Sequence, residues 1–85
     1  MNMITLKPFK KANLRLLISE EAQRINNYKD CDVIQEALIM VESSKEDTET
    51  LDAIEYLITA VSYRGGDTKL IKQYKSEFIN EINPF

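Results

Sequence analysis

Apolar side chains recur at helical spacing over the second half of the chain and part of the first. Residues three and four apart share one face of a helix, so a repeated 3–4 pattern predicts an amphipathic helix that packs on a core. Three such stripes are present: Val33, Ile34, Ala37, Leu38 and Val41; then Leu51, Ile54, Leu57, Ile58 and Val61; and last Leu70, Ile71, Tyr74, Phe78 and Ile82.

Polar and glycine residues mark the ends of these three predicted helices. Asp32 suits an N-cap of the first, and the second begins near Asp47–Thr48. Gly65-Gly66 follows the second helix, and glycine is the residue that most readily adopts the left-handed backbone conformation found at helix C-termini. Asp67 suits a cap of the last helix, which we expect to end at Asn83 because the following Pro84 disfavours helical geometry there.

The first third of the chain allows two interpretations. A helix capped by Asn13 and running to about Ile25 is favoured, because residues 19–24 are good helix formers without a turn residue. Pro8 is expected to stop any helix begun before it, which leaves an extended N-terminal arm. Alternation of apolar positions over residues 14–18 keeps open a hairpin of residues 3–8 and 13–18. The expected fold is therefore all-α, with three or four short helices and an extended arm, and the alternative is an α+β fold with that hairpin plus three helices.

Composition excludes several kinds of catalytic and metal-binding site but adds little to the predicted fold. The 85 residues fit one domain, 1–85, of a size that gains from self-association, and 44% of them are hydrophobic. The chain has no histidine and only one cysteine, Cys31, which excludes Ser-His-Asp and Cys-His nucleophile pairs and a structural zinc site within one chain. No cofactor loop or metal-binding pattern is present, so we expect a protein that is not an enzyme and uses no cofactor or metal. A lone cysteine, no apolar run long enough to span a bilayer and no signal-peptide pattern predict a cytoplasmic protein away from membranes.

Charge is sorted along the chain. Residues 1–30 carry six basic and three acidic side chains, whereas residues 31–63 carry eight acidic side chains and one lysine. Two candidate surfaces follow from this sorting. The acidic set, a candidate protein-binding surface, is Glu42, Glu46, Asp47, Glu49, Asp52 and Glu55. The basic set, a candidate surface for RNA or single-stranded nucleic acid, is Lys7, Lys10, Lys11, Arg15, Lys69, Lys72 and Lys75. The simpler interpretation is that the basic edge pairs with the protein's own acidic block, within one chain or across a dimer.

In small size, eight lysines to three arginines, and many Ile and Asn residues, the chain resembles accessory, counter-defence proteins of large lytic phages and other mobile elements. This resemblance covers the size and composition of the whole chain and rests on no sequence motif. It implies a protein that binds and inhibits or modulates a host protein with a basic surface, such as a defence nuclease or a toxin. The limited core of a short chain and its oppositely charged segments separately predict a homodimer. The alternatives are a nucleic-acid-binding regulator that uses the basic set and a structural assembly subunit.

Overall fold

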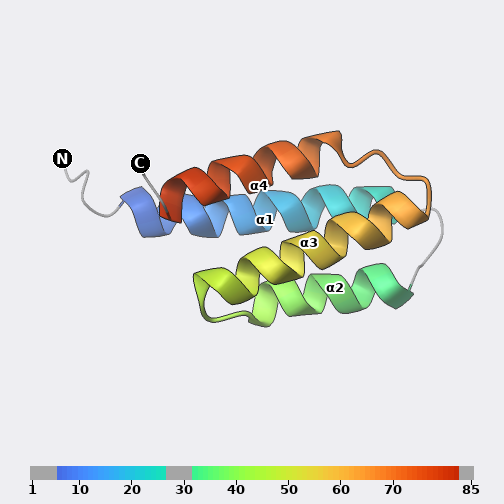
Figure 1. Ribbon diagram of the computed structural model, residues 1–85, viewed down its shortest axis with the longest axis horizontal. Coiled ribbons are helices and arrows are strands. Elements are labelled where there is room, and N and C mark those ends of the chain that lie inside the picture. The colour runs from blue at the N-terminus through green and yellow to red at the C-terminus, as the bar shows by residue number, and fades with distance from the viewer. Residues whose placement is uncertain (1–5, 27–31, 83–85) are drawn as a thin grey trace.

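Four helices make up the described part of the chain, and they confirm the all-α prediction. The computed structural model describes residues 6–26 and 32–82. The helices are α1 (Leu6–Asn26), α2 (Asp32–Ser43), α3 (Asp47–Tyr63) and α4 (Lys69–Ile82). Helix α1 lies mainly along α4 and α2 mainly along α3, and each of these pairs is antiparallel (Figure 1). The assembly is elongated, with extents of 43 × 22 × 21 Å.

Helix α1 begins earlier than expected. The helical interpretation of residues 13–25 is confirmed, but residues 6–12, which we assigned to an extended arm, are helical as well. Pro8 is the third residue of α1 and lies in its first turn, where a backbone N–H has no partner within the helix, so a proline costs little there. The predicted hairpin strand 13–18 is helical, and residues 1–5 lie outside the described part of the chain.

The ends of α2 and α3 follow local polar contacts. Asp32, predicted to be an N-cap, is instead the first residue of α2, where its charge still favours the helix dipole. Helix α3 begins at Asp47 as predicted, with Glu46 as its N-cap. At the other end of α3 the N–H of Gly66 donates to the carbonyl of Val61 (2.9 Å) and that of Gly65 to Ser62 (2.9 Å), which is the hydrogen-bond pattern of a Schellman motif.

Helix α4 has the predicted limits. The carboxylate of Asp67 accepts a hydrogen bond from the backbone N–H of Lys69 (3.0 Å), the first residue of the helix. The helix ends at Ile82, directly before Asn83. Helix α1 ends at Asn26, and residues 27–31, which include Cys31, lie outside the described residues.

One apolar core holds the four helices together. Its fully buried side chains come from every helix, and Phe78, Ile18, Ile34 and Ile54 are among the largest of them. The predicted stripes supply most of these residues, but they also contain side chains that stay exposed. Val33 and Leu70 were expected on the core side and lie 45% and 36% exposed. None of the helices in the described ranges is long and apolar enough to cross a membrane.

Candidate functional site

The acidic set gathers around the turn that joins α2 to α3 and along α3. Glu42 lies near the end of α2, Glu46 caps α3, and the other four members lie on α3 itself. Two of them are ion-paired within the chain: Asp47 with Lys11 of α1 (3.1 Å between Oδ2 and Nζ), and Glu55 with Lys75 of α4. Glu42, Glu46 and Asp52 are exposed, and none of them forms an ion pair with a described residue. The Glu46 side chain accepts from the backbone N–H of Glu49 in a capping box at the start of α3.

Glu49 has a structural role in addition to its charge. Its carboxylate Oε1 accepts hydrogen bonds from the backbone N–H groups of Lys45 (3.0 Å) and Glu46 (3.3 Å). These bonds favour the ionised form and hold the pKa of Glu49 below its ordinary value of 4.5, the bond from Lys45 contributing most. The carboxylate is therefore charged at neutral pH and satisfies backbone donors at the start of α3.

Arg15, a member of the basic set, serves the fold. Its Nη2 atom lies within hydrogen-bond distance of three backbone carbonyls, those of Val41 (2.9 Å), Glu42 (3.1 Å) and Ser44 (3.2 Å). The last carbonyls of a helix have no intrahelical partner, and a cation is favoured at that negative end of the dipole. Arg15 thus caps the C-terminal end of α2 from the side of α1.

The rest of the basic set does not form one surface. Lys11 and Lys75 pair with acidic residues of the chain, as described above. Lys10 is exposed in the first turns of α1, whereas Lys69 and Lys72 are exposed at the start of α4. Because α1 and α4 are antiparallel, these two exposed groups lie toward opposite ends of the molecule (Figure 1). Lys7 belongs to the first turn of α1, at the same end as Lys10.

The outer side of α2 and α3 also carries exposed apolar side chains. Val33 and Met40 of α2 and Tyr56 and Tyr63 of α3 are all exposed, and Tyr63 is 91% exposed. They border two hollows between the helices. The first, of about 300 Å³, is lined by Met40, Ser43, Ser44, Glu49, Asp52 and Ala53. The second, of about 490 Å³, is lined by Val33, Tyr56, Thr59, Ala60, Tyr63 and Arg64.

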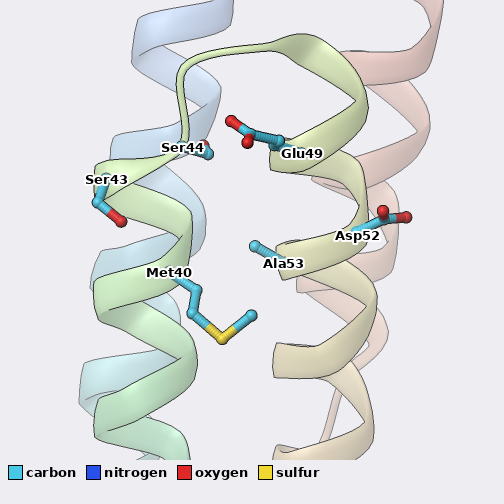
Figure 2. Close-up of a pocket in the computed structure, with 6 residues that line it drawn as sticks. All are labelled: Met40, Ser43, Ser44, Glu49, Asp52 and Ala53. Carbon is cyan, nitrogen blue, oxygen red and sulfur yellow. The ribbon is translucent and has the colours of Figure 1, made fainter.

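Figure 2 shows the first hollow from outside, with α1 and α4 behind. Met40 points from α2 toward α3, where Ala53 faces it, and Asp52 lies on the side of α3 away from α2. The hydroxyls of Ser44 and Thr50 lie 2.6 Å apart and join the turn to α3 by a hydrogen bond. The hollow is therefore walled by a fixed turn at one end and by an apolar contact between helices at the other.

Sequence reasoning did not identify Val33 as part of this apolar face. Val33 was counted as a core residue, whereas it lies exposed beside Tyr56 and Tyr63. A signal was present, because Val33 and Met40 are seven residues apart and so lie on one face of a helix, apart from the buried Ile34 and Val41.

The described residues hold no group of three or more His, Cys, Asp or Glu side chains arranged to bind a metal ion. The surface thus offers charge, aromatic rings and shallow apolar hollows, which suit the contact of macromolecules. Comparison of the chain with protein-family models, curated proteins and solved structures finds no match.

Proposed function

We propose that the protein is a small non-enzymatic binding protein that engages a basic surface of a partner protein and inhibits or modulates it. The observation that carries this proposal is the state of the acidic set: Glu42 and Glu46 are exposed at the turn between α2 and α3, and the described residues offer them no counter-charge. Complementary charge raises the rate of association and penalises wrong partners.

The partner class that fits is a protein that binds or processes nucleic acid. Proteins that bind nucleic acid carry clustered Lys and Arg to contact phosphates, and a rigid array of carboxylates meets the same cations. A host defence nuclease or a toxin is such a protein, in line with the resemblance to phage accessory proteins.

Binding of RNA by the chain itself has less support. Lys11, Arg15 and Lys75 already contact acidic or carbonyl groups of the fold, and the exposed lysines of α1 and α4 lie apart. A salt-dependent phosphate contact needs several cations on one surface.

The test uses the full chain as bait in host lysate at low and high salt. Wild-type protein should retain a basic protein at low salt. The double variant Glu42→Gln/Glu46→Gln should not retain that protein, because two carboxylates proposed to face the partner are neutralised. The matched control, Glu20→Gln/Glu77→Gln, changes net charge equally on α1 and α4 and should retain it.

Equal retention by both double variants would contradict the proposal. A gel shift with single-stranded RNA, run in the same salt series, tests the alternative that the chain itself binds RNA. Binding of RNA that is steeply weakened by salt, with no protein retained, would favour the nucleic-acid regulator instead.

A further inference from the structure

The second hollow, at the end of α3 beside the start of α2, is the larger of the two described above. Its floor is Ala60, a core residue that is only 6% exposed. Exposed apolar and aromatic side chains form its rim: Val33, Tyr56 and Tyr63. The hydroxyl of Thr59 donates to a backbone carbonyl of α3 (3.0 Å), so this polar group is satisfied within the helix. At about 490 Å³ the hollow has the size of ligand sites, which span about 300 to 1,000 Å³.

Arg64 supplies the one charge among the described residues that line this hollow. It is the C-cap of α3, and its backbone N–H donates to the carbonyls of Ala60 (3.3 Å) and Val61 (3.1 Å), which fixes the main chain at the rim. The side chain is exposed, and no described residue forms an ion pair or a hydrogen bond with it. Asp67, the next acid along the chain, already accepts from the backbone N–H of Lys69. The N–H donors of this guanidinium group are therefore available to an anion from outside the described fold.

We infer that this hollow binds a segment of a partner protein in which an aromatic or branched aliphatic side chain stands next to a carboxylate. The apolar side chain enters over Ala60 between Val33 and Tyr56, and the carboxylate pairs with Arg64. Charge complementarity selects this occupant. A basic segment would set cation against cation, and a purely apolar one would desolvate the guanidinium without giving it a partner. Tyrosine and arginine are enriched among the residues that dominate binding at protein interfaces.

The same residues favour a protein segment over a nucleic acid. A single strand of nucleic acid is held by several cations that follow its phosphates, with aromatic rings as stacking surfaces for its bases. Arg64 is the one basic residue among the described residues of the lining, and the floor is a buried methyl group that offers no hydrogen bond to a base.

The hollow lies at the opposite end of the α2–α3 hairpin from Glu42 and Glu46, so the inference goes beyond the proposed function and stands or fails without it (Figure 1). The test is an NMR titration of the isotope-labelled full chain, with the dipeptide acetyl-Phe-Glu-amide as the probe. We expect saturable amide shifts at Val33, Thr59 and Ala60, with a dissociation constant on the order of millimolar for so small a ligand. Acetyl-Phe-Gln-amide, which lacks the charge, and acetyl-Gly-Glu-amide, which lacks the apolar side chain, should each bind about threefold more weakly or worse.

Arg64→Gln should bind the charged and the uncharged Phe dipeptides equally, because only the ion pair distinguishes them. The matched control is Lys72→Gln, which removes an exposed cation near the start of α4 that does not line the hollow, and it should keep the wild-type preference. Tyr63→Ala should weaken the binding of both Phe dipeptides by about threefold, the effect of losing an aromatic contact. Its amide spectrum elsewhere should stay that of wild type, since Tyr63 is 91% exposed.

Shifts that do not saturate, or that fall outside the hollow, would overturn the inference. Equal affinity of wild type for the charged and the uncharged Phe dipeptides, or a preference that survives Arg64→Gln, would do the same. Tighter binding of the thymidine dinucleotide TpT than of acetyl-Phe-Glu-amide at the same amides would assign the hollow to nucleic acid instead.

Discussion

Arg15 shows how one side chain of α1 joins the far end of the next helix, α2. A single nitrogen of its guanidinium group approaches three carbonyls at the end of α2, so its loss would leave helix-end acceptors without a charged donor. We expect Arg15→Met to lower the free energy of unfolding by about 1 to 2 kcal/mol, the usual size of charge-assisted hydrogen bonds at partly exposed sites.

Urea denaturation measures this effect, with Lys10→Met as the control. Lys10 is an exposed cation on the same helix and no described residue pairs with it, so its replacement should change stability by less than about 0.5 kcal/mol. Equal losses for the two variants would show that Arg15 acts only through its contribution to net charge.

The sequence did not reveal this role of Arg15, because its acceptors are backbone atoms 26 to 29 residues away. Periodicity identifies which side chains turn toward a core, but long-range contacts of a polar residue depend on which helices become neighbours. The same limit explains why Lys11, Arg15 and Lys75 were assigned to a nucleic-acid surface. Glu49 was nearer to prediction, since its partners lie three and four residues before it.

At the scale of elements, the end of α3 depends on two glycines for different reasons. Gly65 has a φ of 85° and open space where a Cβ would stand, whereas a Cβ on Gly66 would lie 2.7 Å from Val61 Cγ1 and 2.8 Å from Ile25 Cγ2. The first glycine is needed for its backbone conformation and the second for its lack of a side chain.

Substitution by asparagine separates these causes. Asn adopts the left-handed region more readily than Ala, so Gly65→Asn should cost less stability than Gly65→Ala, which we expect to cost about 1 kcal/mol. At Gly66 the order should reverse, because a larger side chain adds to overpacking worth about 1 to 3 kcal/mol. Thermal unfolding of the four variants gives the comparison, and the same order at both positions would contradict it.

Helix number and most helix limits could be predicted because they rest on local signals: the stripes, Gly65-Gly66 and the cap at Asp67. The start of α1 could not. Pro8 was taken as a stop, yet a proline in the first turn removes no hydrogen bond, and only the position of the true start distinguishes the two cases.

At the scale of the whole molecule, the sorting of charge along the chain becomes pairing in space. Lys11 of α1 forms an ion pair with Asp47 at the start of α3. Lys75 of α4 forms an ion pair with Glu55 in the middle of α3. Both ion pairs are partly exposed, so each adds little to stability. Together they join α1 and α4 to the acidic helix α3. Part of the acidic set is thereby neutralised, and Glu42 and Glu46 remain outside these pairs.

The arrangement of α1 along α4 and α2 along α3 also determines the order in which the structure opens. The α2–α3 pair forms by closing a turn of a few residues, whereas the α1–α4 contact joins segments separated by the whole α2–α3 hairpin and has a larger loop-closure cost. We therefore expect local opening to release the α1–α4 contact first. Native-state amide exchange should therefore be slower in α3, around Ile54 and Leu57, than in α1 or α4, and equal protection would indicate a single cooperative unit. Helices α1 and α4 would then loosen while the α2–α3 hairpin, with its exposed Tyr56 and Tyr63, keeps its shape.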